Sequence, residues 1–170
     1  FDKEALRVAK IRGATTQYFD FYKPYKEPFP GDKFDIIVLT EVLQYPLDPN
    51  KLLQNLLKKL KKNGKVLISL PNENTLYHRI MSLLGYGIDS HAFRLFKQLT
   101  LPTIAQDRNF VSQFLTVEKE VYFYNAGFQN TRTNWLGSLT KLVPDKIWEW
   151  LANNFPGLFA RGVIFVCKNI

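Results

Sequence analysis

The chain has 170 residues, a single cysteine, an aromatic content of 15% and a formal net charge of +8 at pH 7. This length is enough for one domain with a sizeable core, and the aromatic content argues against disorder. The lone Cys167 excludes a disulfide framework and indicates a reducing, cytoplasmic compartment. No apolar run reaches the roughly 18–20 residues of a membrane span, and no secretory signal is visible.

The positive charge says little about partners. A net charge of +8 would help attract nucleic acid, anionic lipid or an acidic substrate. However, six lysines lie on or beside one leucine-rich stretch, where we expect them to form the solvated back of an amphipathic helix. These lysines are Lys51, Lys58, Lys59, Lys61, Lys62 and Lys65.

The amino-terminal segment predicts a helix and then a short strand. Asp2 can cap a helix whose apolar residues end at Ile11, and Gly13 would close it. Thr16–Phe19 reads as a strand that ends at Asp20. The chain begins without an initiator methionine, so we expect it to be a piece of a longer protein.

The clearest pattern runs from Phe34 to Asn72 and predicts a strand, a helix and a second strand. Ile36–Leu39 is an unbroken aliphatic run, as expected of a strand covered on both faces. Asp48 can cap the helix, Asn63-Gly64 would end it in the left-handed conformation, and Val66–Leu70 is the second strand. Leucines at helical spacing lie between the cap and that end: Leu52, Leu53, Leu56, Leu57 and Leu60.

The remaining elements are predicted more weakly. An apolar stripe from Leu76 to Leu84 predicts a helix that ends at Gly85, inside a long segment, 73–112, that we expect to form a lid. Pro144 opens an amphipathic helix within an insert at 137–160. Residues 162–168 read as a final strand. We expect residues 1–170 to form one domain.

Two stretches of the central pattern resemble a known family. FDIIVLTEVLQYPLDP followed by LLKKLKKNGKVLISLPN is similar to the second half of a class I S-adenosylmethionine-dependent methyltransferase. The most similar subgroup contains small-molecule, quinone, lipid and glycan-precursor enzymes. The resemblance implies a Rossmann-like α/β sheet, mostly parallel, with an antiparallel last strand. It also implies that the first strand and its glycine-rich cofactor loop are absent from this sequence.

The same resemblance adds elements towards the carboxyl end. A segment from Phe114 to Gly127 is similar to the family helix that begins at a threonine cap, here Thr116. Thr131–Trp135 would then be the sixth strand, and residues 162–168 the seventh.

The resemblance also implies cofactor-binding residues. In the preferred alignment, the acid that holds the cofactor's ribose would fall one position before Phe1. Phe1 would then pack on the adenine, and Asp2 would be a helix cap. If the alignment slips by one or two residues, Asp2 becomes the ribose ligand instead. Asp20 would accept a hydrogen bond from the adenine amino group, and the backbone of Phe21 would meet the ring. The loop after the first central strand would border the cofactor through Thr40, Glu41 and Val42.

Acceptor-side residues follow from the same loop and from the lid. The family pattern Glu-Val-Leu-Glu-His appears here as Glu41-Val42-Leu43-Gln44-Tyr45, so an aromatic replaces the histidine. Tyr45 could wall the acceptor pocket or face the sulfonium, and Asn72 would border the substrate. His78 and His91 are the two candidate bases, although each taken singly is more often a solvated side chain. No metal-ligand spacing is present.

These features favour methyl transfer from S-adenosylmethionine to a small-molecule or lipid-like acceptor. An already activated methyl group needs mainly alignment and exclusion of water, so the lack of a conspicuous catalytic triad is compatible with this reaction. The absent glycine loop favours an alternative, a non-catalytic methyltransferase-like binding or scaffold module. A nucleic-acid methyltransferase is a further alternative that the aromatic lid disfavours. A homo-oligomer is left open.

Overall fold

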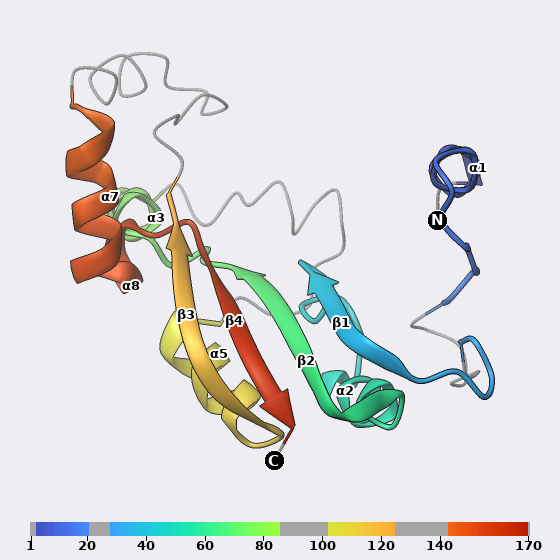
Figure 1. Cartoon of the computed structure of the whole chain (residues 1–170). Coiled ribbons are helices and arrows are strands. Elements are labelled where there is room, and N and C mark those ends of the chain that lie inside the picture. The colour runs from blue at the N-terminus through green and yellow to red at the C-terminus, as the bar shows by residue number, and fades with distance from the viewer. Residues whose placement is uncertain (1–2, 21–27, 86–101, 125–142, 170) are drawn as a thin grey trace.

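The computed structural model describes residues 3–20, 28–85, 102–124 and 143–169, and these residues form an α/β fold (Figure 1). The elements are α1 (Lys3–Ile11), β1 (Phe34–Thr40), α2 (Pro49–Leu57), β2 (Leu60–Pro71), α3 (Leu76–Leu83), α5 (Ile104–Ser112), β3 (Leu115–Phe123), α7 (Asp145–Asn154), α8 (Pro156–Phe159) and β4 (Gly162–Asn169).

The strands form one sheet in the order β1-β2-β4-β3. β1 and β2 run parallel and are joined by α2, whereas β4 is antiparallel to both of its neighbours. The predicted α/β class, the central strand–helix–strand unit and the antiparallel last strand are therefore confirmed. That last strand lies between β2 and β3 and not at the edge (Figure 1).

The core is built around β2 and β4. Alternate residues of both strands are buried, as expected when one face of each strand packs inward. Leucines of α2 and apolar residues of α5 belong to the same cluster, so both helices pack against this part of the sheet. The buried hydrophobic residues of the four elements are Leu52, Leu53, Leu60, Val66, Ile68, Leu70, Ile104, Val111, Val163, Phe165 and Cys167.

The beginning of the central helix was predicted correctly and its end was not. The Asp48 side chain accepts a hydrogen bond from the backbone N–H of Lys51, which caps α2 as expected. The helix stops at Leu57, however, and Gly64 lies inside β2. A Cβ at Gly64 would lie 2.9 Å from the backbone oxygen of Asp35, so glycine there allows β1 to approach closely.

The first central strand is confirmed, but it is covered on one face only. Leu39 is buried and Ile37 is half-buried, whereas Ile36 and Val38 are 58% and 60% exposed. Within the described part of the chain, β1 pairs with β2 alone, which leaves its other edge and one face without a neighbour. The aliphatic run predicts a strand correctly but does not reveal which elements cover it.

Two predicted elements are wrong. Thr16–Phe19 forms no strand, because no described strand lies beside it to pair with its backbone. The predicted helix from Thr116 is strand β3, whose alternating exposure fits the two-residue period of a sheet better than a helical stripe. Thr131–Trp135, the predicted sixth strand, lies outside the described residues.

The helix that precedes β3 is α5. Thr103 and Gln106 form a reciprocal capping box at its beginning, a signal that sequence analysis missed. An ionic cluster then ties α5 to the strand, because Arg108 donates through Nε to Glu120 Oε1 at 2.5 Å and through Nη2 to Glu120 Oε2 at 2.7 Å. The Tyr122 hydroxyl also donates to that carboxylate, so the guanidinium and the phenol fix one side chain between them.

Two other helices agree with their predictions. α3 ends before Gly85, whose φ of +82° is the left-handed conformation that glycine favours. Pro144 precedes α7 directly, and α7 and α8 lie within the predicted 137–160 insert. No helix in the described ranges is both long and apolar enough to cross a membrane.

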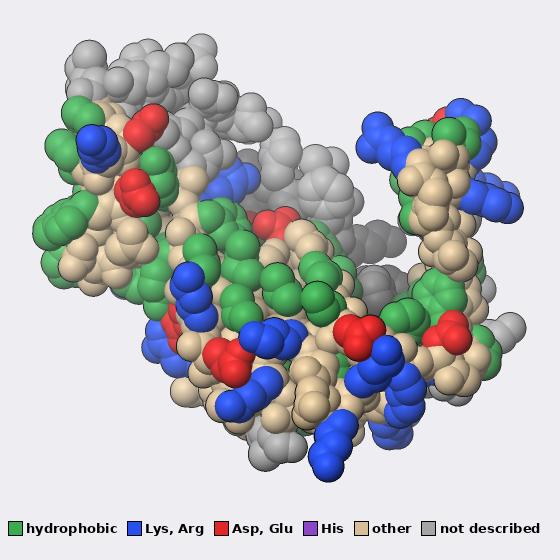
Figure 2. Space-filling view, in the orientation of Figure 1, with side chains coloured by type: hydrophobic (Ala, Val, Ile, Leu, Met, Phe, Trp, Pro, Cys, Tyr) green, Lys and Arg blue, Asp and Glu red, His purple; other side chains and the backbone are tan. Residues whose placement is uncertain are grey.

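The lysine-rich stretch is mostly solvated, as expected, with one exception. Five of the six lysines are exposed, and on the face in Figure 2 positive side chains are interspersed with Asp and Glu. Lys59 is buried, and its Nζ donates to the backbone oxygen of Phe29 at 2.9 Å. A hydrogen bond to a carbonyl offsets part of the cost of burying this ammonium group.

Candidate functional site

The candidate site lies where β1 and β2 end. Parallel strands place their carboxyl ends at one edge of the sheet, where α/β proteins bind ligands. Thr40 pairs with Ser69, and the backbone N–H of Glu41 donates to the Ser69 oxygen at 3.0 Å. The chain after Glu41 and the chain after Pro71 therefore leave the sheet side by side.

The loop after β1 turns sharply at Glu41. Its φ of 49° lies in the left-handed region, an uncommon conformation for a residue with a side chain. The Glu41 and Thr40 side chains are exposed at the sheet edge, whereas Val42 packs against the core. The turn presents a carboxylate to the edge while apolar Val42 holds the loop in place.

Asn72 ties the end of β2 to the helix before β4. It is buried, and its Nδ2 donates to the backbone oxygen of Ala160 at 2.8 Å. Its Oδ1 accepts from the backbone N–H of Asn74 at 3.0 Å. Its amide is thus committed to the backbone, and the predicted contact of Asn72 with substrate remains a prediction.

His78 is held from the first turn of α3. Its Nδ1 is hydrogen-bonded to Thr75 Oγ1 at 3.1 Å, and its Nε2 lies 3.9 Å from Glu73 Oε2. The ring also makes an edge-to-face contact with Tyr77. One nitrogen is therefore anchored, and the other faces a carboxylate at more than hydrogen-bonding distance.

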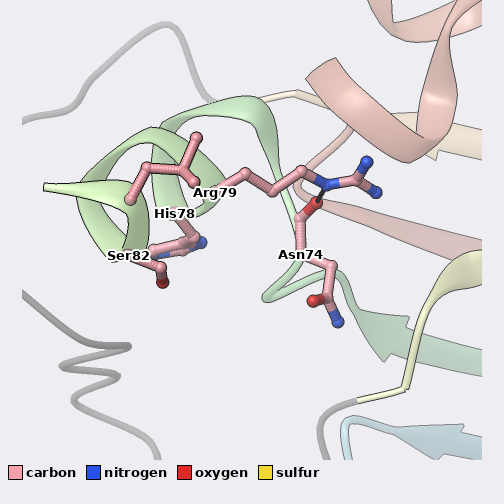
Figure 3. A pocket seen from close by; sticks show the side chains of 5 residues that line it. Asn74, His78, Arg79 and Ser82 are labelled. Atoms are coloured by element: carbon pink, nitrogen blue, oxygen red, sulfur yellow. Dashed lines mark hydrogen bonds between the residues drawn. The ribbon is translucent and has the colours of Figure 1, made fainter. Parts of the chain in front are cut away.

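A pocket of about 450 Å³ opens beside this histidine (Figure 3). Its lining includes Asn74, His78, Arg79, Ser82 and Leu83, so α3 and the turn before it supply the walls. Arg79 donates through Nε to the backbone oxygen of Asn74 at 2.9 Å, and its side chain extends away from His78 in Figure 3.

The phenol of Tyr45 is affected by charges from both loops. Burial raises the pKa of the Tyr45 phenol, a hydrogen bond from the Gln44 side chain lowers it, and the charges of Glu41 and Glu73 raise it further. Two carboxylates from different loops therefore act on one phenol. Sequence analysis did not select Glu73, although an acid just after a strand-ending Pro71 at this edge was a usable signal.

The predicted cofactor residues are only partly described. Asp20 is half-buried and accepts a hydrogen bond from the Tyr18 hydroxyl at 3.0 Å. Phe1, Asp2 and Phe21 lie outside the described residues, as does His91. Thr40, Glu41, Val42 and Tyr45 lie at the end of β1 and in the loop after it, whereas His78 lies on α3, which follows β2. The predicted roles of all these residues remain predictions.

Two other kinds of chemistry find little support in the described part of the chain. No group of three or more His, Cys, Asp or Glu side chains there could hold a metal ion. Cys167 is buried in β4, and burial raises the pKa of its thiol to about 11, so the reactive thiolate is scarce at neutral pH.

Comparison with protein families identifies the class. Residues 4–131 match the model of a methyltransferase domain family, which is about three-quarters of the chain. The chain therefore belongs to this methyltransferase family. A comparison with curated proteins gave no match.

Three solved structures, two of them methyltransferases, are similar to this chain at low identity. An Archaeoglobus fulgidus SAM-dependent methyltransferase shares 17% identity with a TM-score of 0.45, over 82% of this chain and 61% of that one. The Bacillus subtilis YcgJ protein shares 15% with a TM-score of 0.51, over 99% and 79%. The plantazolicin methyltransferase BpumL, solved with SAH, shares 15% with a TM-score of 0.48, over 99% and 64%. The chain thus spans less than two-thirds of two of these proteins, and the YcgJ match supports the fold.

Proposed function

We propose that the protein transfers a methyl group from S-adenosylmethionine to a small-molecule or lipid-like acceptor. The observation that carries the proposal is the edge at which β1 and β2 end, because the chain after Thr40 and the chain after Pro71 leave the sheet there side by side. Family membership supports methyl transfer, and the open α/β sheet supports ligand binding at this edge.

The residues of this edge fit such a cofactor. Bound S-adenosylmethionine would supply a methyl group on a positively charged sulfonium. Glu41 and Glu73 place negative charge at the edge, and the buried Gln44 Oε1 has no hydrogen-bond partner. Thr40, Glu41 and Val42 would line the cofactor, with Asp20 towards the adenine and Tyr45 towards the transferred methyl group.

The protein's side chains would then orient the acceptor molecule and, where needed, remove its proton. The pocket beside α3 would hold the acceptor and exclude water, which aligns the acceptor atom with the methyl group. A hydroxyl acceptor must lose a proton, and His78 is the described candidate base because Thr75 fixes its ring. A nucleophilic amine acceptor would need less help.

An apolar body for the acceptor rests on the sequence of the predicted lid alone. Phe110 and Phe114 pack edge to face at 5.6 Å between ring centroids, but both rings pack against the core, and Phe114 directly precedes β3, whose first residue is paired with Asn169 at the opposite end of the strands. Phe93 and Phe96, the other aromatic residues of the predicted lid, lie outside the described residues. The small-molecule, quinone, lipid and glycan-precursor subgroup remains the one that the sequence motifs favour.

Calorimetric titration of S-adenosylhomocysteine tests the proposal. It is carried out with this chain and with the longest natural protein that contains it. Binding by the longer protein, with or without binding by this chain, is the expected result. Binding by neither would overturn the proposal and favour the non-catalytic binding or scaffold module.

A further inference from the structure

One group of side chains at the sheet edge combines two carboxylates with an amide and a phenol. We call Glu41, Gln44, Tyr45 and Glu73 the acidic crevice. Glu41, Gln44 and Tyr45 follow β1, whereas Glu73 follows β2, so the group joins both loops. The backbone N–H of Glu41 donates to the Ser69 oxygen, so Glu41 and Glu73 follow neighbouring strand ends, and the charges of both carboxylates raise the pKa of the Tyr45 phenol.

Gln44 shows independently that an acceptor in this crevice is unsatisfied. Its side chain is 3% exposed, and its Oε1 has no hydrogen-bond partner. The same side chain is hydrogen-bonded to Tyr45. Because Oε1 makes no bond, Nε2 is the atom that donates, and the amide oxygen lies beside the Tyr45 hydroxyl. A buried carbonyl oxygen without a donor is costly, so a donor from a ligand would remove that cost.

The described residues leave the two carboxylates poorly neutralised. Glu73 has one ion-pair partner, His78 Nε2 at 3.9 Å, and the Glu41 carboxylate has none among the side chains described. Arg79 is the next cation on α3, but its Nε bonds to a backbone oxygen and its side chain extends away from His78 (Figure 3). In a chain with a net charge of +8, this is a local excess of negative charge.

We propose that the acidic crevice binds a protonated amine. An ammonium group brings three N–H donors and a positive charge, which match one amide oxygen and two carboxylates. The face of Tyr45 adds a favourable surface for a cation. This inference rests on the proposed function, which supplies two sources of such a group: an acceptor molecule that carries an amine, or the amino group on the methionine part of the cofactor.

Binding measurements with paired probes distinguish the sources. For the acceptor, 1,4-diaminobutane is compared with neutral 1,4-butanediol by calorimetry, in the presence of S-adenosylhomocysteine. For the cofactor, S-adenosylhomocysteine is compared with 5′-methylthioadenosine, which lacks the amino-acid part. In one of the two pairs, we expect Glu73→Gln to weaken the ammonium-bearing probe about tenfold or more and to leave its neutral counterpart unchanged.

Matched variants separate charge from folding. Glu73→Asp keeps the negative charge and should keep most of the affinity, and Glu41→Gln should act in the same direction as Glu73→Gln. Glu118→Gln is the control, because Glu118 pairs with Lys65 and Lys168 towards the opposite end of the strands. Thermal unfolding of each variant checks that it is folded.

Other outcomes overturn the inference without deciding the proposed function. Wild-type protein that binds neither ammonium probe more tightly than its neutral counterpart would overturn it, as would equal losses for both members of a pair in Glu73→Gln. Binding of S-adenosylhomocysteine and 5′-methylthioadenosine with equal affinity would still support the proposed function. Conversely, a diamine preference that is lost in Glu73→Gln would support the inference even if no cofactor analogue bound.

Discussion

The central strands of the sheet and helix α1 both have a clear apolar pattern in the sequence, but only the strands bury their apolar residues. β2 and β4 bury alternate residues along their length, and Phe165, Val66 and Ile68 have no exposed surface. α1 is an amphipathic helix with a closing Gly13 at φ +88°, yet none of its residues is buried and Ile11 is 69% exposed. Figure 1 shows α1 apart from the sheet.

This difference shows that the local sequence signals of an element do not determine how deeply the element is buried. Capping, closing glycines and apolar spacing determine whether a segment is a helix or a strand. Most helical stability in proteins comes from packing of the apolar face, which requires a neighbouring element. We therefore expect substitutions in β2 and β4 to change the free energy of unfolding strongly, and substitutions in α1 to change it little.

The largest expected effect is at Phe165. Phe165→Ala removes a fully buried ring from β4 and leaves a cavity, so the free energy of unfolding should fall by about 3–5 kcal/mol. Urea unfolding followed by circular dichroism measures it. Ile11→Ala is the matched control in α1 and should change the same quantity by less than about 0.5 kcal/mol. A comparable loss in both variants would contradict the comparison.

Asp107 in α5 provides a pH-dependent test of the core. It is 4% exposed, its Oδ2 has no hydrogen-bond partner, and burial raises the pKa of its carboxyl from 3.8 to about 7. The folded state therefore holds the proton more tightly than the unfolded state. This contribution to stability is complete below about pH 4 and is lost as the pH rises through about 7, by at most about 4 kcal/mol.

Asp107→Asn should flatten that dependence. Thermal unfolding between pH 4 and pH 8, a range set by those two pKa values, should show stability falling in the wild type and falling less in the variant. Asp32→Asn, an exposed acid in a turn, is the control and should keep the wild-type slope. If Asp107→Asn left the pH dependence of stability unchanged, the Asp107 carboxylate would have a hydrogen-bond or ion-pair partner in solution.

A smaller effect is expected at the joint between β2 and α8. Asn72→Ala removes the donor to Ala160 and the acceptor for the Asn74 N–H, which leaves backbone groups unsatisfied. The free energy of unfolding should fall by about 1–3 kcal/mol. If Asn72 also contacts substrate, S-adenosylhomocysteine affinity should remain while acceptor binding weakens, which calorimetry of the folded variant would detect.

Sequence analysis predicted the parts of the fold that depend on local signals. The strand at Ile36–Leu39, the cap at Asp48 and the final strand follow from periodicity and turn chemistry, and all three are present. It failed where pairing decides the structure. Thr16–Phe19 has strand-forming residues but no described strand beside it, and the segment after Phe114 pairs with β4 as a strand instead of forming the predicted helix.

The site was predicted from a family pattern and only as far as that pattern extends. Glu41 and Tyr45 were found because they occupy family positions, whereas Glu73 matches no motif in the pattern. The contact of Glu73 with His78 depends on how the chain turns after β2, and its effect on Tyr45 depends on the pairing of β1 with β2. Neither relation is visible as a spacing along the sequence.

The smallest expected effect is on the surface of α1. Arg7 donates to both oxygens of Glu4, with Nε to Oε2 at 2.8 Å and Nη2 to Oε1 at 2.5 Å. The geometry is that of a bidentate pair, but both side chains are more than 60% exposed, and water and salt screen such pairs. Glu4→Gln should therefore leave the urea midpoint of the protein unchanged within error. A clear loss of stability would show that α1 packs against the rest of the protein in solution, and it would remove the contrast with β4 on which the Phe165→Ala experiment depends.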